Sequence, residues 1–354
     1  MTGPADNESD WENKFYWSFY ELSNGNIINL HYIENWEKNK FVDADYDYNY
    51  TKYELKNGKI ISYEFGDAKA SDADAMSEEF FDWFESLPPY NDLKKPVFES
   101  FSSEFLMVQK EINSFIKNIK DWSEPEKISG NLMNFPSQDF ILHEPYGTVL
   151  MISPWNYPFQ LPMVPLIGAI ATGNTVILKP SESAPNTTKV LIKILKAVFP
   201  QEWVSVIEGD ASLAQALLKE QWDYIFYTGS TEVGRIVAKA AAEYLTPITL
   251  ELGGKSPCVV DGTAPLKITA RRIVWGKFLN CGQTCIAPDY VLVKSEFKAK
   301  LITAIIEEIE KAFGENAQKS KDYGRIIHEK HFKKLESDLK KQKIIYGGST
   351  DKKE

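Results

Sequence analysis

Residues 147–182 read GTVLMISPWNYPFQLPMVPLIGAIATGNTVILKPSE, and apolar runs of strand length stand near its two ends, TVLMIS at 148–153 and TVIL at 175–178. Further runs of the same kind occupy 203–207, 224–227 and 247–252. Helical stretches alternate with them at about 186–199, 211–220 and 231–245. Strands that alternate with helices over such lengths predict an α/β fold built on a doubly wound parallel sheet, with right-handed crossovers.

Polar and glycine-rich residues follow the ends of these strands, where doubly wound sheets bind their ligands. They are Asn156, Lys179 with Glu182, Gly229 with Ser230, and Glu251. A lysine and a glutamate at a strand end can hydrogen-bond the hydroxyls of an adenosine ribose. A solvated charged loop is the alternative for Lys179 and Glu182.

Two of these positions lie in local sequences that suit a specific chemistry. GSTEVG at 229–234 opens a helix after a strand, and free amides at a helix N-terminus attract phosphate. Because it matches neither G-x-G-x-x-G nor a P-loop, an ordinary βα turn is the alternative. Asn156 lies in the proline-stiffened turn SPWNYPF at 153–159, where a rigid amide can donate to a developing oxyanion or simply form the turn.

A carboxylate and a thiol lie in glycine-containing segments, LELGG at 250–254 and NCGQTC at 280–285. Glu251 and Cys285 supply what covalent thiol catalysis needs, a base that activates water and a nucleophile. Most cysteines are instead small buried hydrophobes, and Cys258 in the run PCVV is predicted to be one. Cys281 precedes Cys285 by four residues, which is not a Cys-x-x-Cys spacing, so neither a metal nor a disulfide is expected there.

The composition is that of a globular protein of two or three domains, with 354 residues of which 43% are hydrophobic and 25% charged. No apolar run approaches the roughly 20 residues that span a bilayer, and the acidic, polar N-terminus is unlike a secretory or transit peptide. The 3 cysteines suit a reducing compartment, and the 4 histidines have no zinc-site spacing. We therefore expect a cytoplasmic protein without a metal.

The net charge of -10 is concentrated near the N-terminus. Residues 1–90 contain 19 acidic and 7 basic side chains, a charge of -12, so that the remainder carries +2. Since the chain has no basic stripe, no nucleic-acid partner is expected.

The segments on either side of the α/β region are simpler. Residues 1–66 are rich in aromatic and acidic side chains, and the turn signals Asn24-Gly25 and Asn57-Gly58 predict a small antiparallel β unit, with a linker at about 66–77. A short helix at 78–87 and a core-facing amphipathic helix at 99–121 are predicted next. Beyond residue 259, helices are predicted at about 266–279 and 297–313, and His328 and His331 are expected at the surface of a charged helix.

Taken jointly and in this order, PWNYP, KPSE, TGSTEVG, LELGGKSP and NCGQTCIAP resemble the aldehyde dehydrogenase superfamily. The sequence segments EPYG, NCGQTCIAPDYVLV and YGRIIHEKHF are most similar to its class 3 or fatty-aldehyde branch, and the resemblance extends over about residues 92–354. The resemblance implies oxidation of an aldehyde to a carboxylate with NAD or NADP. It also implies a Rossmann-like cofactor domain at 78–256 and a partial catalytic domain at 257–354, preceded by an unmatched acidic segment at 1–77.

By the same resemblance, Cys285 is the nucleophile, Asn156 with the Cys285 amide stabilises the oxyanion, and Glu251 activates the water that hydrolyses the thioester. The expected cofactor residues are Trp155, Lys179, Glu182, Gly229, Ser230 and Gly234. The carboxylate of Glu182 would repel a 2′-phosphate, which favours NAD over NADP.

The resemblance also implies differences from the family. Its members continue beyond the final residues YGGSTDKKE, with a Glu-x-Phe-Gly-Pro motif and a dimerising strand, so a fragment, a frameshifted product or a fusion is expected. A homodimer is implied only if that tail is not essential. The alternatives are an inactive pseudoenzyme that binds a nucleotide or a partner, and an N-terminal interaction module attached to a dehydrogenase remnant. Acyl transfer to coenzyme A is disfavoured because Glu251 is present.

Overall fold

The computed structural model describes residues 13–21, 27–35, 47–56, 59–68 and 92–351, the first four ranges as backbone alone. The chain forms two compact units, Met1–Ser86 and Leu87–Glu354. In the part described, no helix combines the length and the apolar character needed to cross a membrane.

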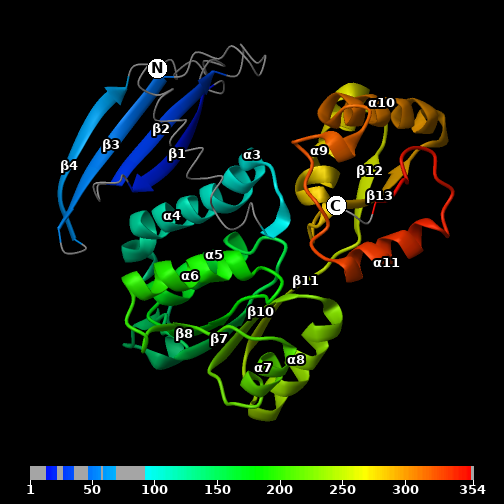
Figure 1. Cartoon of the computed structure of the whole chain (residues 1–354). Coiled ribbons are helices and arrows are strands. Elements are labelled where there is room, and N and C mark those ends of the chain that lie inside the picture. Colours follow the sequence, from blue (N-terminus) through cyan, green and yellow to red (C-terminus); the bar gives the residue numbers. More distant parts are fainter. Residues whose placement is uncertain (1–12, 22–26, 36–46, 57–58, 69–91, 352–354) are drawn as a thin grey trace. The chain divides into compact units, whose positions relative to one another are not determined.

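The first unit contains a four-stranded antiparallel sheet in the order β1-β2-β3-β4 (Figure 1). Its strands are β1 (Asn13–Glu21), β2 (Ile27–Asn35), β3 (Asp47–Lys56) and β4 (Lys59–Ala68). This is the small antiparallel unit that the sequence predicts, although β4 extends into the predicted linker. The turns Asn24-Gly25 and Asn57-Gly58, the rest of the linker and the predicted helix at 78–87 lie outside the described residues.

The centre of the second unit is a five-stranded parallel sheet in the order β11-β10-β7-β8-β9. Its strands are β7 (Thr148–Ile152), β8 (Thr175–Lys179), β9 (Val204–Val206), β10 (Tyr224–Gly229) and β11 (Ile248–Leu252). The chain starts in the middle at β7, builds outward to β9, and then returns to the other side of β7. The predicted doubly wound sheet is thereby confirmed, and its switch point lies between β7 and β10, where such sheets bind ligands.

Four helices connect these strands: α5 (Gln160–Ala171), α6 (Pro185–Val198), α7 (Ala211–Leu217) and α8 (Thr231–Tyr244). The last three match the predicted helices. The first was not predicted, because Pro162 and Pro165 interrupt its sequence and proline normally disfavours a helix interior.

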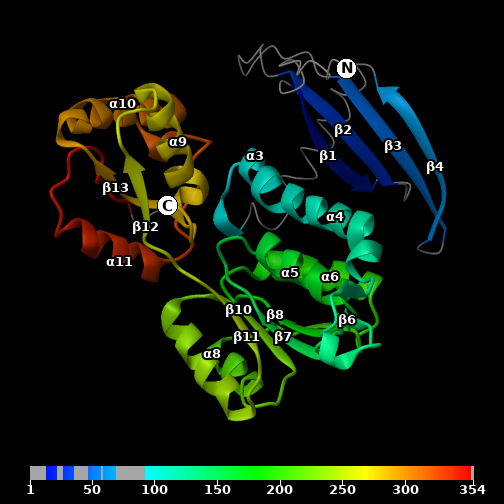
Figure 2. The ribbon, with the colours of Figure 1, turned by 180° about the vertical axis from the view of Figure 1, so that it is seen from behind.

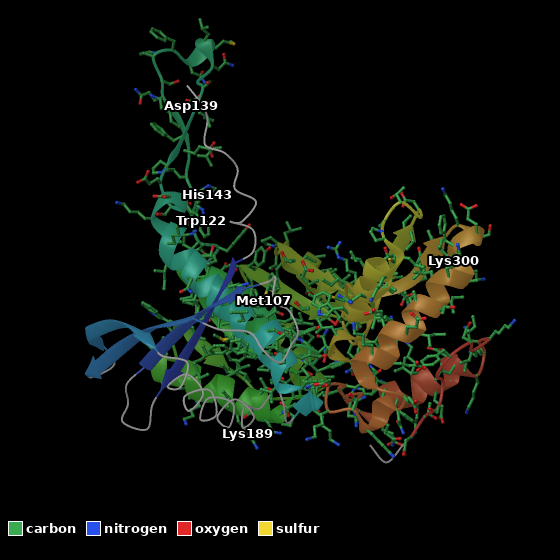
Figure 3. The ribbon with its side chains drawn as sticks, turned by 90° about the horizontal axis from the view of Figure 1, so that it is seen from above. Met107, Trp122, Asp139, His143, Lys189 and Lys300 are labelled. Carbon is green, nitrogen blue, oxygen red and sulfur yellow. The ribbon has the colours of Figure 1, made fainter. Side chains whose placement is uncertain are left out.

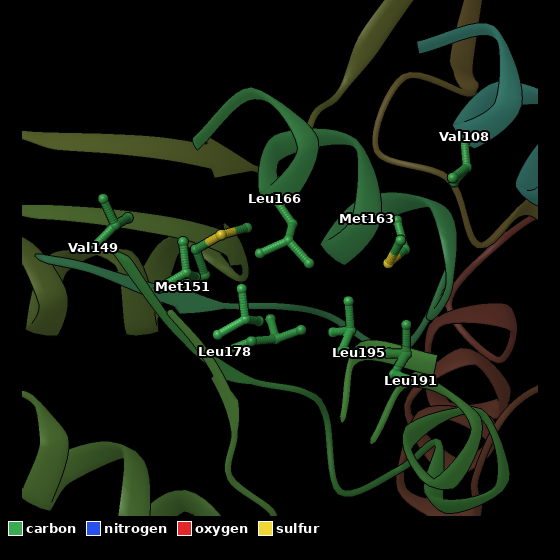
Figure 4. Packing of buried hydrophobic residues seen from close by; sticks show 10 residues of the cluster. Val108, Val149, Met151, Met163, Leu166, Leu178, Leu191 and Leu195 are labelled. Carbon is green, nitrogen blue, oxygen red and sulfur yellow. The ribbon is translucent and has the colours of Figure 1, made fainter. Parts of the chain in front are cut away.

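Alternate residues of the central strand β7 supply two hydrophobic cores, one on each face of the sheet. Val149 and Met151 pack with residues of α4, α5 and α6, including Met163, Leu166 and Leu191 (Figure 4). On the opposite face, Leu150 and Ile152 pack with residues of α7 and α8, among them Leu217, Val237 and Ala241. This two-sided burial fixes the position of the loop that follows β7.

A nearly continuous helix precedes the sheet, formed by α3 (Val97–Ser100), a π turn at Phe101–Phe105 and α4 (Leu106–Trp122). It begins two residues earlier than predicted. The prediction of a core-facing helix holds only in part: Val108 is buried, but Ile112 is exposed and the Ile116 side chain is 74% exposed. Only the N-terminal half of α4 contributes to the core, through Leu106, Val108 and Gln109.

After β11 the chain leaves the central sheet and builds a smaller α/β layer (Figure 2). It contains the parallel pair β12 (Ser256–Val260) and β13 (Pro288–Val293), with α9 (Leu266–Phe278) and α10 (Ser295–Phe313) at the predicted positions. Val260, Ala270 and Leu301 form its core, and Cys258 packs against them, half-buried. The short turns Leu279–Gly282 and Ala317–Lys319 and the helix α11 (Glu329–Leu339) complete it.

A hairpin of β5 (Glu126–Ile128) and β6 (Asp139–Ile141) extends from the end of α4, beyond Trp122 (Figure 3). Its tip carries exposed apolar side chains at Leu132, Met133 and Phe135. The sequence gives little sign of it, because each strand has only three residues.

Candidate active site

Two loops from distant parts of the chain are hydrogen-bonded to each other, the turn after β7 and the loop that carries Cys285. The side-chain amide of Asn156 donates from Nδ2 to the Gln283 carbonyl at 2.9 Å. The hydroxyls of Tyr157 and Thr284 are 2.6 Å apart. Burial raises the pKa of Tyr157 to about 12, so its hydroxyl keeps its proton. Asn156 therefore lies beside the two residues that precede Cys285.

The loop begins with an unusual turn, in which Asn280, Cys281 and Gly282 all have positive φ, at 54°, 55° and 77°. This left-handed conformation is costly for residues with a Cβ, so other contacts must hold it. Asn280 is 1% exposed, and its Nδ2 donates to the carbonyls of Asn156 at 2.7 Å and Gln283 at 3.3 Å.

The side chain of Gln283 fixes the other end of the turn. Its Nε2 donates to the Arg325 carbonyl at 3.0 Å, and its Oε1 accepts the Ile327 N–H at 3.0 Å. The residues before Cys285 are thereby tied both to the turn after β7 and to the segment before α11. None of these polar partners was foreseen, because side chains distant in sequence become neighbours only through the fold.

The third predicted catalytic residue approaches from β11. Glu251 is exposed on that strand, and the chain then passes through Gly253 and Gly254. A Cβ at Gly254 would lie only 2.6 Å from the Cys285 carbonyl oxygen, whereas one at Gly253 would meet no atom within 4 Å. The structure thus brings the segment after Glu251 against the backbone of Cys285, in the loop whose Gln283 carbonyl accepts from Asn156.

A buried ion pair lies behind the turn that carries Asn156. Lys95 and Glu104 are 0% and 1% exposed, and their side chains are 2.6 Å apart. Lys95 also donates to the Asn156 carbonyl at 3.0 Å and lies 4.1 Å from the centre of the Tyr157 ring. Glu104 accepts the Phe159 N–H at 2.8 Å. Burial lowers the pKa of Lys95, although the charge of Glu104 acts in the opposite direction.

A second carboxylate on the same helix supports the other loop. Glu99 accepts the Asn280 N–H at 2.9 Å. Burial raises the pKa of Glu99 to about 7, against the lowering effects of this hydrogen bond and of Lys95. Sequence reasoning missed Lys95, Glu99 and Glu104.

The expected cofactor residues lie at the carboxyl ends of β8 and β10. Lys179 is 4% exposed and pairs with Glu182 at 2.7 Å. Partial burial raises the pKa of Glu182, but its hydrogen bonds and the charge of Lys179 together outweigh this and leave the pKa below its ordinary value. Lys179 supplies donors and Glu182 an ionised acceptor, which together fit the hydroxyls of a ribose.

Ser230 caps α8 by accepting the Val233 N–H at 3.3 Å, and the helix N-terminus suits a phosphate. Gly229 has no room for a side chain beside the Tyr227 hydroxyl. Gly234 has a packing position instead: it is buried in the first turns of α8, and a Cβ there would lie 2.7 Å from Leu252.

Trp155 contacts the two histidines near the start of α11. Its ring centre is 4.9 Å from that of His331 and 6.1 Å from that of His328. The expectation that these histidines are surface residues is therefore wrong, since both are half-buried. His328 caps α11 through Nδ1, and burial lowers the pKa of His331.

Comparisons with known proteins identify the relatives of this chain. The model of the aldehyde dehydrogenase family matches residues 95–354. Aldehyde dehydrogenase family 3 member A2 of Pongo abelii is 47% identical over 260 residues, which are 73% of this chain and 54% of that protein. The 4,4'-diaponeurosporen-aldehyde dehydrogenase of Staphylococcus aureus is 46% identical over 267 residues, 75% of this chain and 58% of that one. The chain thus spans little more than half the length of these relatives.

Solved structures show the same fold. A substrate-bound Staphylococcus aureus AldH has a TM-score of 0.72 at 44% identity, covering 79% of this chain and 61% of that one. A Mycobacterium tuberculosis aldehyde dehydrogenase complexed with NAD+ has a TM-score of 0.68 at 24% identity, covering 79% of this chain and 58% of that one, and supports the fold alone. By sequence and by fold, the chain belongs to the aldehyde dehydrogenase family.

Proposed function

We propose that the protein oxidises an aldehyde to a carboxylic acid with NAD(P)+, through a covalent intermediate on Cys285. The observation that carries this proposal is the bonding of the Asn156 turn to the Cys285 loop, with the segment after Glu251 against the Cys285 carbonyl. Residues 78–256 would hold the cofactor, and residues 257–354 would supply the thiol.

In the first step, Cys285 gives up its proton to solvent, the thiolate sulfur forms a bond to the aldehyde carbon, and the carbonyl oxygen becomes an oxyanion. An asparagine amide has two N–H donors, and Asn156 gives one to the Gln283 carbonyl. The second is available for the oxyanion, together with the backbone N–H of Cys285. Donors that are already oriented before the reaction stabilise such charge without reorganisation.

When bound, the nicotinamide ring supplies the acceptor for the hydride that leaves the former aldehyde carbon. The product on the enzyme is a thioester of Cys285. Glu251 then removes a proton from a water molecule, which attacks the thioester carbon and releases the acid and the thiol. The exposed side chain of Glu251 gives it access to that water.

Lys179 and Glu182 would bind the adenosine ribose, and Ser230 with the N-terminus of α8 would receive the pyrophosphate. The ionised carboxylate of Glu182 would accept from a free 2′-hydroxyl and repel a 2′-phosphate, so we propose NAD as the preferred cofactor.

The test measures NADH formation by the full chain with NAD+ and a series of medium-chain and aromatic aldehydes, together with NAD+ binding by calorimetry. Turnover that depends on both aldehyde and NAD+ is the expected result. Folded protein that binds NAD+ without forming NADH would overturn the proposed activity and favour a nucleotide-binding pseudoenzyme.

A further inference from the structure

One short stretch, Lys95 and the start of the helix that follows it up to Glu104, contacts both loops of the candidate site. From its two ends, Lys95 and Glu104 hold the turn after β7 through the Asn156 carbonyl and the Phe159 N–H. Between them, Glu99 reaches the other loop and accepts the Asn280 N–H. Lys95 directly precedes the N-cap Pro96, Glu99 lies in α3 and Glu104 lies in the π turn that follows, so one short stretch of chain supports both loops.

The Asn280 N–H is the point at which support is most needed. Asn280 and Cys281 are the first two residues of the left-handed turn, and each costs about 1–3 kcal/mol in this conformation. The side chain of Asn280 donates to the carbonyls of Asn156 and Gln283. If the backbone of Asn280 rotated, its side chain would lose both carbonyls, and Gln283 would move relative to the Asn156 amide.

We propose that Glu99 is a positioning residue for the reaction: by accepting the Asn280 N–H, it keeps the Asn156 amide and the Cys285 thiol aligned on one substrate carbonyl. This inference rests on the proposed function for the identity of the reacting groups. It goes beyond that function by assigning their alignment to a side chain that contacts neither substrate nor cofactor.

The surroundings of Glu99 favour a role as a hydrogen-bond acceptor rather than as a charge. Lys95 is already paired with Glu104, and Asp322 adds a second negative charge nearby. Tyr157, Cys281, Tyr323 and Arg325 are the other ionisable groups of this region. A carboxyl group has an accepting oxygen whether it is ionised or protonated, and the neutral side-chain amide of glutamine also has one.

The matched pair Glu99→Gln and Glu99→Met tests the proposal, because both side chains have the length of glutamate and only Gln retains an acceptor. Glu111→Ala is the control, about 18 Å further along the same helix. Two quantities are measured on the full chain: hydrogen exchange of the peptide 279–287 by mass spectrometry, and kcat and KM for aldehyde and NAD+.

We expect Glu99→Met to speed exchange in 279–287 and to lower kcat by about tenfold, the effect of losing one hydrogen bond to a carboxylate. The KM values should stay near those of the wild type, exchange in β7 should not change, and Glu99→Gln should restore both kcat and exchange. The proposal would be overturned if Glu99→Gln and Glu99→Met impaired kcat equally, or if Glu99→Met behaved like the wild type. An increase in exchange that is equally large in β7 would also overturn it.

Two further results complete the test. Should the Met variant fail to fold, slow exchange of the Asn280 amide in the wild type is expected, and exchange at the rate of an open loop would overturn the inference. If the wild type forms no NADH while exchange follows the expected pattern, the proposed function fails but the positioning by Glu99 stands.

Discussion

The two sides of the candidate site differ in how firmly they are held. On the amide side, which comprises Asn156, Tyr157 and the loop 280–284, backbone and side chains are connected by hydrogen bonds and supported by the buried pair Lys95–Glu104. On the acid side, Glu251–Gly254, Glu251 is exposed and Gly253 has open space around it.

This difference corresponds to the two halves of the proposed reaction. Oxyanion stabilisation requires donors fixed before the substrate arrives, since their benefit comes from avoided reorganisation. Activation of water requires a base that can reach solvent and act only after hydride has left. We therefore expect the rigid amide to stabilise the oxyanion and the accessible acid to activate water, both at the same thiol.

The contrast between a rigid amide side and an accessible acid side has no catalytic meaning if Cys285 is not the nucleophile. Cys285→Ala should lower NADH formation by about 10⁴-fold or more, as loss of a catalytic nucleophile does elsewhere. The control is Cys281→Ala, four residues away, which should retain most of the activity. If both variants lost NADH formation to a comparable extent, the loop would tolerate no change and the sulfur of Cys285 would have no assigned role.

The comparison is sharpened by separating the two steps in rapid-mixing experiments. Asn156→Ala should slow the first turnover by about 10²–10³-fold. Glu251→Gln should leave a rapid burst of NADH equal to the enzyme concentration and slow the following steady state by about 10²-fold or more. A Glu251→Gln enzyme without a burst would contradict the assignment of the acid to the second step.

The rigidity of the amide side should be visible in stability. Lys95→Met leaves the carboxylate of Glu104 buried without its partner, a change that costs about 3–5 kcal/mol in comparable cases. Urea unfolding measures the loss. The matched variant on the acid side, Glu251→Gln, should change the free energy of unfolding by no more than about 0.5 kcal/mol.

The smallest expected effect is a pH dependence from Glu99. Its pKa is raised from 4.5 in the reference state to about 7 in the folded protein, so the folded state favours the protonated form. The stabilising contribution is therefore complete below about pH 4.5 and is lost as the pH rises through about 7. Unfolding free energies of the wild type should fall relative to Glu99→Gln across this range, and a constant difference would contradict the shifted pKa.

The sequence predicts the sheet better than it predicts the contacts of the site. The five strands could be recognised because each is a short apolar run between helices, and β7 supplies both cores from alternate residues. Helix α5 was missed because Pro165 lies within it. The partners of Asn156 are separated from it by 61 residues at Lys95 and by 127 at Gln283, so no local pattern contains them.

The catalytic residues named from sequence carry recognisable motifs, whereas the residues that hold them do not. Lys95, Glu99 and Glu104 resemble the solvated charges of any amphipathic helix until the fold shows what they contact. Likewise, His328 and His331 read as surface residues because their contact with Trp155 forms only when α11 meets the turn after β7.

The close approach of Gly254 to the Cys285 carbonyl has a mechanical consequence. Because even a methyl group does not fit between them, a displacement of Gly254 toward Cys285 would meet the backbone of that residue. Any side chain added at Gly254 would therefore have to displace the backbone that carries the sulfur.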